Sequence, residues 1–440
     1  MDALASNSHP PPPVSEGAPG WQRGFWCLMA TQFQGAFSDN LLKALVIFLF
    51  MAQKWPKEKL EALVSHSNTY FAIPFLLFSA TGGWMADRFS KRSVMRGVKT
   101  AELAIMGFAT YALASGHLRF QLVAICLMGV HSAFFAASKY GSLPEIVPTA
   151  RLSWANGIIE MLTFLAAILA TLAAGWMAVA FARSPDWIGV ILLGLSASGW
   201  VASLGITRLR PAHPTKPFRA NFLGELWRDF AWMRGDRDLW RANIGNTAFF
   251  FVAILVQMNL LLYADQVLKV DTLRTSGLQV ALALGMAGGS LLAGKLSRDR
   301  IEYGLVPLGA ALLAASSLAL GWPGLPRPAV MVALVLLGIG GGLFIVPVAA
   351  VLQHRPPATR KGSVQGAASW LSWVGISAAA YLQGVLSLGL GWSPGRIFWF
   401  CAAAAALMGG FVAWNRPRAL PDMVGRWVGK VPAASGPEGG

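Results

Sequence analysis

Charged residues are scarce in this sequence of 440 residues, in which Asp, Glu, Lys and Arg together account for only 13%. A soluble globular protein carries about 25% of such residues, whereas hydrophobic residues make up 55% of this chain. A water-soluble domain of this composition could not cover its surface with polar groups, and a disordered chain would be far less hydrophobic. The composition excludes both classes and indicates a membrane protein with many spans.

Cysteine is almost absent, and the start of the chain lacks the features of a targeting signal. Cys27, Cys126 and Cys401 all lie in hydrophobic stretches, so no disulfide framework is expected. Residues 1–20 contain no Lys or Arg, no hydrophobic core and a run of four prolines. This composition argues against a secretory signal peptide and favours a disordered tail.

Acidic residues are few: 20 Asp and Glu stand against 36 Lys and Arg, which gives a net charge of +16 and an isoelectric point near 10.3. The basic residues are spread between hydrophobic runs and do not form one patch with interleaved aromatics. Nucleic acid is therefore not an expected partner.

Twelve continuous hydrophobic runs follow one another, each long enough for a membrane-spanning helix. Continuous runs are typical of helices, whereas a membrane β-barrel needs short alternating strands. The expected spans cover residues 25–52, 68–86, 98–116, 120–138, 154–181, 186–206, 242–264, 276–295, 302–321, 328–352, 363–390 and 395–415.

The loops between these spans alternate strongly in basic charge. One side carries 26 of the Lys and Arg residues together with both termini, and the other side carries nine. Since cytoplasmic loops are enriched in Lys and Arg, both termini are predicted to be cytoplasmic. The nine residues expected on the opposite side are Lys54, Lys57, Lys59, Arg119, Arg183, Lys269, Arg274, Arg327 and Arg396.

The longest internal linker, residues 207–241, divides the spans into six and six. Phe222, Leu226, Phe230 and Met233 recur in it at helical spacing between charged residues, which predicts an amphipathic helix at the cytoplasmic membrane surface. The expected organisation is a tail (1–23), a six-helix bundle (24–206), the linker (207–241), a second bundle (242–415) and a tail (416–440).

Two landmarks recur between the halves at nearly the same offset. A Gly-initiated basic loop begins at Gly83 and again at Gly294, and a basic turn followed by serine begins at Arg151 and again at Arg360. This repetition favours a duplicated six-helix unit, although short basic loops can also resemble one another by chance.

The loop at residues 83–92 has the sequence G-W-M-A-D-R-F-S-K-R. It resembles the signature loop of the major facilitator superfamily, G-x-L-A-D-R/K-x-G-R/K-R/K, with departures at Met85 and Ser90. Gly83 permits close helix packing, and Asp87 can interact with a helix end or a cation. The resemblance implies a gate that closes the cytoplasmic side, against the simpler interpretation that the loop only sets topology. Arg298 stands where the second half would need the acid, so an asymmetric gate is expected. The candidate gating residues are Gly83, Asp87, Arg88, Lys91, Arg92 and Arg151.

The first span carries a polar stripe deep in the membrane. Asp39 lies 13 residues after Trp26, about 20 Å along a helix, where a charge costs on the order of 3 kcal/mol. Lys43 is four residues later on the same face and could pair with it, and Gln32 lies on the same stripe. The stripe therefore predicts either a cavity-lining site or a buried structural ion pair.

Three stretches carry a more specific resemblance. Residues 35–40 (G-A-F-S-D-N), 139–145 (K-Y-G-S-L-P-E) and 156–166 (N-G-I-I-E-M-L-T-F-L-A) are similar to the motifs G-A-F-N-D-N, K-Y-G-x-L-P-E and N-G-x-x-E-M-x-T-F-L-A of bacterial lysophospholipid transporters. Ser38 departs from the usual Asn. In some bacteria this domain is fused to acyltransferase and acyl-carrier-protein synthetase domains. The similarity extends over roughly residues 24–415 and is weaker in the second half.

Several further polar residues are candidates for substrate contact. Glu160 could bind a cation on the substrate or pair with Lys139 or Arg151, and Asn156 lies on the same stripe. By analogy with the superfamily, Gln257 could line the cavity, although hydrogen bonding between helices is an equal alternative. His131 is expected to be a hydrogen-bonded core residue, and Glu102 is expected to form a shallow pair with Lys99. The candidate substrate-binding residues are Asp39, Asn40, Lys43, Gln32, Glu160, Asn156, Lys139, Tyr140 and Gln257.

Enzymatic motifs are missing. Residues 289–296 (G-S-L-L-A-G-K-L) are one residue short of a phosphate-binding loop and lack its Ser or Thr. No His has an Asp five residues later, as an acyltransferase of the fused relatives' type would require. No enzyme, metal site or cofactor is expected.

The expected fold is an all-α membrane protein of the major facilitator type, with twelve transmembrane helices in two six-helix bundles. The resemblance implies a lysophospholipid flippase of the bacterial inner membrane, which moves lysophosphatidylethanolamine-like lipids inward for re-acylation, with membrane lipids and a separate acyltransferase chain as partners. The alternatives are a proton-coupled exporter of amphipathic drugs and a polytopic lipid-modifying enzyme or its scaffold subunit.

Overall fold

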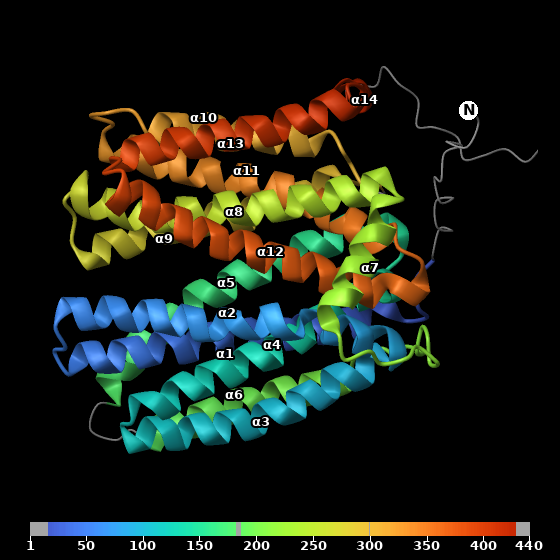
Figure 1. Cartoon of the computed structure of the whole chain (residues 1–440), viewed down its shortest axis with the longest axis horizontal. Coiled ribbons are helices and arrows are strands. Elements are labelled where there is room, and N and C mark those ends of the chain that lie inside the picture. The colour runs from blue at the N-terminus through green and yellow to red at the C-terminus, as the bar shows by residue number, and fades with distance from the viewer. Residues whose placement is uncertain (1–15, 182–185, 299, 428–440) are drawn as a thin grey trace, which may run out of the picture.

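The computed structural model describes residues 16–181, 186–298 and 300–427, and within them the chain is helical. Arg183, most of the tail at 1–23 and the end of the tail at 416–440 lie outside the described residues. Six long helices come first, then a short helix, and then six more long helices (Figure 1).

The first six long helices lie together in one half of the molecule (Figure 1). They are α1 (Trp21–Ala52), α2 (Lys57–Arg88), α3 (Lys91–Ser115), α4 (Leu118–Ile146), α5 (Leu152–Ala180) and α6 (Asp186–Leu204). We call this group the first bundle. Two hydrophobic cores fill it, one around Leu45 and Met128 and one around Phe25 and Ile159.

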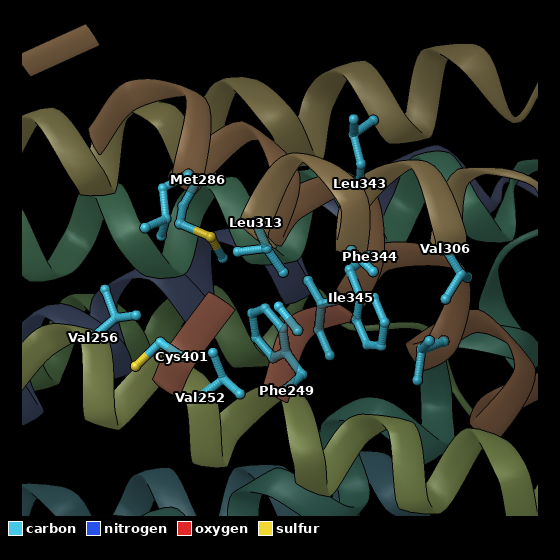
Figure 2. Close-up of a cluster of buried hydrophobic side chains, with 14 of the residues drawn as sticks. Phe249, Val252, Val256, Met286, Val306, Leu313, Leu343, Phe344, Ile345 and Cys401 are labelled. Carbon is cyan, nitrogen blue, oxygen red and sulfur yellow. The ribbon is translucent and has the colours of Figure 1, made fainter. Parts of the chain in front are cut away.

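The second bundle is formed by the helices that follow α7 (Phe222–Arg234). They are α8 (Arg237–Gln266), α9 (Thr272–Leu296), α10 (Leu305–Leu320), α11 (Arg327–His354), α12 (Lys361–Gly384), which continues as a π-helical turn (Val385–Gly389), and α13 (Pro394–Asn415). Figure 2 shows its core, in which the rings of Phe249 and Phe344 stack with centroids 5.9 Å apart.

Within the described residues, nine helices are long and apolar enough to cross a membrane. The shorter α10 is an apolar helix of 16 residues, whereas α2 and α3 carry clusters of polar residues at their ends. All three pack along the other spans, with α2 against α4, α3 against α4 and α6, and α10 against α11 and α13. The twelve expected spans are therefore all helices of this fold.

The predicted linker helix is present as α7, and it is packed against both bundles. It packs against α2, α8 and α12, and Phe222, Phe230 and Trp232 contact the second core. We call the end of the molecule where α7 lies the linker end (Figure 1). α1 begins here, and a further helix that the sequence did not predict, α14 (Ala419–Trp427), ends here.

The same local structure precedes α5 and α12. A single 3₁₀ turn, Thr149–Arg151 in one case and Ala358–Arg360 in the other, ends at an arginine and leads directly into the long helix. These are the two basic turns that the sequence repeats, and they bring the start of α5 beside α9 and the start of α12 beside α2.

Candidate functional site

A pocket of ≈ 310 Å³ lies between the two bundles, at the middle of their length. Its lining is divided unevenly between the bundles, because all of its ionisable side chains come from α1, α4 and α5. These are Asp39, Lys43, His131, Lys139, Tyr140 and Glu160. The second bundle contributes uncharged polar and apolar groups, namely Asn246, Phe250, Ile345, Ala349, Leu352, Gln353, Gln365, Ala368, Ser369, Ser372, Trp373 and Ile376.

Asp39 reaches the pocket as predicted, but the expected ion pair with Lys43 is not formed. The Asp39 carboxylate accepts a hydrogen bond of 2.6 Å from the Ser132 hydroxyl, and its Oδ1 has no hydrogen-bond partner among the described residues. The Lys43 Nζ lies instead 4.3 Å from the centroid of the Phe71 ring on α2, a cation–π contact. The spacing of four residues allows the pair, but the neighbouring helix offers Lys43 another partner.

Two more residues of the α1 stripe line the pocket, and their side-chain amides donate hydrogen bonds within the first bundle. Gln32 donates to the Thr163 hydroxyl of α5 at 3.0 Å, and Asn40 donates to the carbonyl of Ala36 at 2.8 Å. Gly35 and Ala36 complete the stripe on the pocket side. The stripe therefore faces a cavity, one of the two alternatives that its sequence left open.

A second group of ionisable residues joins α4 to α5. The Tyr140 hydroxyl donates to Glu160 Oε1 at 3.3 Å, and Lys139 Nζ lies 4.0 Å from the centroid of the Tyr140 ring. No ion pair joins Glu160 to Lys139 or to Arg151 among the described residues, and Arg151 is exposed at the linker end. Both Glu160 and Lys139 thus present their ionisable groups to the pocket without a direct ion pair between them.

Behind the pocket lies a buried polar network that the sequence did not reveal. Lys99 contacts Glu102 at 2.6 Å and donates to Gln34 Oε1 at 2.7 Å, while Gln34 donates to the other Glu102 oxygen at 2.8 Å. His131 Nε2 lies 3.1 Å from Glu102. Lys99 and Glu102 do pair, but the pair is fully buried and not shallow. Their partners come from α1 and α4, which the spacing on one helix cannot predict.

Two residues expected in the pocket lie elsewhere. Asn156 is buried and exchanges two hydrogen bonds with Gln353 of α11, of 2.9 and 2.7 Å, so its amide joins the bundles on the linker side of the pocket. Gln257 is exposed near the far end of α8 and does not line the pocket, where α8 contributes Asn246 and Phe250. His131, expected to be a core residue, is buried and also lines the pocket.

At the linker end, Asp87 joins α2 to the start of α12. Its buried carboxylate accepts hydrogen bonds from the backbone amides of Gly362 and Ser363, at 2.6 and 3.0 Å, and from the Ser363 hydroxyl at 2.6 Å. Negative charge is favoured at a helix N-terminus, because the first amides have no partner within the helix. Lys216 of the linker also reaches Asp87, at 2.8 Å, and contacts the Ser363 hydroxyl.

The basic residues around Asp87 have separate partners. Lys91 is buried and pairs with Glu145 at 2.7 Å, Arg92 donates to the carbonyl of Leu204 at 2.9 Å, and Arg88 donates to the carbonyl of Lys216. The first two contacts hold the first bundle together, and the third ties α2 to the linker.

The linker helix adds an acid beside this junction. Asp229 lies 3.9 Å from Arg360, and its side chain is largely buried. Burial raises the pKa of Asp229 to about 6, although Lys216 and Arg360 act in the opposite direction. The junction therefore includes a carboxylate whose pKa lies well above the usual range of an aspartate.

Glycines bring the backbones of the two bundles into contact along two seams. In the α2–α12 seam, a Cβ at Gly83 would lie 2.7 Å from the Gly362 carbonyl oxygen, and one at Gly366 would lie 2.5 Å from that of Ser79. In the α5–α9 seam, a Cβ at Gly157 would lie 2.5 Å from the Ser290 carbonyl oxygen. Any larger side chain would push the bundles apart at these points.

Residues 28–380 match the Major Facilitator Superfamily. The chain is 28% identical to the lysophospholipid transporter LplT of Cronobacter sakazakii over 76% of its own length and 81% of the relative's, and 27% identical to LplT of an Enterobacter species over 90% and 97%.

Solved structures agree on the fold. The human organic anion transporter MFSD10 matches with a TM-score of 0.76 at 15% identity, over 90% of this chain and all of that one. The transporter FucP in its outward conformation matches with a TM-score of 0.72 at 12% identity, over 90% and 99%. The matched family covers most of the sequence and both bundles, so this chain belongs to the Major Facilitator Superfamily and is a multi-pass membrane transporter, not an enzyme.

Proposed function

We propose that this protein carries lysophospholipids from the outer to the inner leaflet of the bacterial inner membrane, by alternating access, for re-acylation on the cytoplasmic side. One observation carries the proposal. The pocket presents two carboxylates and two ammonium groups that do not pair with each other, all on the first bundle, opposite a wall without charge. A ligand with both charges at one end and a hydrocarbon chain at the other matches this division.

The charged side fits a zwitterionic head group. Among the described residues, Asp39 has one carboxylate oxygen without a partner and Glu160 accepts one long hydrogen bond, so either can receive an ammonium group. Lys43 and Lys139 contact aromatic faces and have no carboxylate partner among the described residues, which leaves their ammonium groups available for a phosphate. Complementary charge of this kind replaces the hydration that the head group loses on entry.

The uncharged side fits an acyl chain. A pocket of ≈ 310 Å³ is at the small end of ligand sites, so it holds the head group and the chain must extend between helices. Phe71 and Phe75 of α2 and Trp373 of α12 line the pocket where the bundles meet, with the Phe75 and Trp373 rings stacked at 4.3 Å. These rings offer the hydrocarbon a path along the α2–α12 seam.

The movement follows from the contacts at the linker end. We infer that residues 24–206 and 242–415 rock as two units and that the linker end, with both termini, faces the cytoplasm, in agreement with the basic residues of the loops. Asp87, Gly83 and the cations around them then close the cytoplasmic side. The relatives named lysophospholipid transporters support the choice of substrate, and a separate acyltransferase would consume the product.

The proposal is tested with purified protein in proteoliposomes that contain labelled lysophosphatidylethanolamine, with the diacyl lipid as a control. We expect the protein to accelerate flipping of the lysolipid and not of the diacyl lipid. Equal rates with and without the protein would overturn the proposal. Efflux of amphipathic drugs driven by a proton gradient, without lysolipid flipping, would instead establish the exporter.

The site assignment is tested with the double variant Asp39→Asn/Lys43→Met, whose matched control is Glu58→Gln/Lys59→Met on the exposed start of α2. Removal of one positive and one negative charge keeps the net charge of the pocket and creates no new unpaired ion, so folding should survive. We expect flipping to fall at least about tenfold, since a hydrogen bond to a charged group contributes about 1.5–3 kcal/mol. A double variant as active as the control would refute the assignment.

A further inference from the structure

A second pocket lies at the linker end, outside the central site, where α5 meets α9. Its volume is ≈ 570 Å³, and it is lined by Arg151, Trp154, Leu291, Gly294, Lys295 and Arg298. Three of these six side chains are cations and none is an acid. Arg151 belongs to the first bundle and the other two cations to the second, so the positive charge spans the α5–α9 seam.

These cations lack counter-charges within the described part of the chain. Arg151, Lys295 and Arg298 are all exposed, and none of them forms an ion pair with a described acid. Arg298 also has a positive φ of 48°, a conformation that is uncommon for a residue other than glycine. Asp299, the next residue in the sequence, lies outside the described residues and is included in the test below.

The surroundings place this pocket at the boundary between hydrocarbon and water. The Trp154 ring is 6.2 Å from that of Trp26, which is 52% exposed, and Leu291 and Leu292 are each 40% exposed on α9. Exposed tryptophan is enriched at the level of the lipid head groups. A basic pocket beside exposed leucines is typical of a site for a whole lipid, whereas a free phosphate would gain nothing from the leucines.

We propose that this pocket binds the phosphate of an anionic phospholipid whose acyl chains lie along Leu291 and Leu292. The bound phosphate joins Arg151 of one bundle to Lys295 and Arg298 of the other. It thereby supplies the negative charge that the α5–α9 seam lacks and stabilises the closed linker end.

The test uses the full-length protein, delipidated in neutral detergent, with phosphatidylglycerol as the probe and native mass spectrometry as the measure of binding. The variant is Arg151→Gln/Lys295→Gln/Arg298→Gln. The matched control, Arg208→Gln/Arg210→Gln/Arg418→Gln, removes the same charge from exposed residues at the same end. Only the variant removes the cations that line the pocket and would contact the phosphate, and charge-assisted contacts are the strong ones, so we expect the variant to bind at least about tenfold more weakly, and the control to bind like the wild type.

Three further arms make the outcome decisive. Phosphatidylglycerol should raise the melting temperature of the wild type but not that of the variant, while both melt alike without lipid. Inorganic phosphate at millimolar concentration should not compete. Asp299→Asn should change binding by less than about threefold. Equal loss in variant and control, competition by free phosphate, or much stronger binding by Asp299→Asn would each overturn the proposal.

Discussion

The α2–α12 and α5–α9 seams are built alike in shape and differently in charge. Both bring glycines against the backbone of the facing helix, and in both a long helix begins beside the end of a helix of the other bundle. In the first seam, the buried Asp87 accepts three hydrogen bonds from the start of α12 and pairs with Lys216. In the second, the only polar contact that we find in the described residues is a bond of 3.3 Å from the Ser153 hydroxyl to the Arg300 carbonyl.

This difference separates two contributions to closure. Packing is shared by both seams, whereas the buried carboxylate belongs to the first. On the α5 side the bundles are joined by the uncharged hydrogen bonds between Asn156 and Gln353 and, under our proposal, by the phosphate of a lipid. Arg298, which stands where the repeated loop would need an acid, marks the place where the two halves differ.

The largest effect is expected from Asp87→Asn, which removes the charge from the first seam and keeps the shape of the side chain. Charge-assisted hydrogen bonds contribute about 1.5–3 kcal/mol, so the ratio of closed to open linker end should fall by about 10- to 100-fold. Spin-label distances between the linker ends of the two bundles measure this ratio. The matched control, Asp265→Asn, alters an exposed acid at the far end of α8. If Asp87→Asn left the distances unchanged, Asp87 would only pack or set topology.

A smaller effect than that of Asp87→Asn is expected when the packing of a seam is disturbed, and this effect should be the same for both seams. A Cβ at Gly366 or at Gly157 would lie 2.5 Å from a carbonyl oxygen of the facing helix, and such overpacking costs about 1–3 kcal/mol. Gly366→Ala and Gly157→Ala should therefore open the linker end to a similar extent in the same distance measurement. Gly107→Ala, with no neighbouring atom within 4 Å, should have no effect on it. A much larger effect at one seam would show that the packing is not shared.

The smallest effect concerns Asp229, which lies on the helix that covers only the first seam. Its pKa is raised from 3.8 to about 6, so the folded protein binds this proton more tightly than the unfolded chain does. The corresponding part of the unfolding free energy is greatest at or below about pH 4, falls as the pH rises to about 6, and is constant above that.

The Asp229→Asn variant lacks this pH dependence. Between pH 4.5 and pH 7.5, its unfolding free energy should therefore rise by on the order of 1 kcal/mol relative to that of the wild type. Melting temperatures of both proteins in detergent at the two pH values measure the gain, with Asp422→Asn on α14 as the control. If the melting temperature of Asp229→Asn changed between the two pH values as much as that of the wild type, the pH dependence would belong to another group.

Hydrophobicity predicted the spans well because a bilayer requires long apolar runs. It gave the part of each helix that lies in the hydrocarbon, but not the residues where the helix begins and ends. α2 begins at Lys57, eleven residues before its apolar run, since a polar stretch continues the same helix beyond the hydrocarbon. The nine-residue α14 was not predicted at all, because it is too short to give a periodic signal.

Residues of the candidate site were predicted correctly where the sequence of a single helix was enough to identify them. The depth of Asp39 in a hydrophobic run indicated a cavity, and Asp39 lines one. Partners on other helices could not be predicted, which is why Lys43 was assigned to Asp39 although it lies over Phe71. The contact between Glu102 and His131 was missed for the same reason.

The uneven lining of the central pocket has a consequence for how such a transporter can diversify. If the charged groups of the first bundle recognise the head group and the second bundle forms most of the wall along the hydrocarbon, the two preferences are encoded largely in separate halves of the gene. Substitutions on α8, α11 and α12 could then adapt the protein to a new chain length while the ionic contacts of α1, α4 and α5 stay intact. A chimera that joins the first half of this chain to the second half of a relative would inherit its choice of polar group from one parent and its tolerance of chain length from the other.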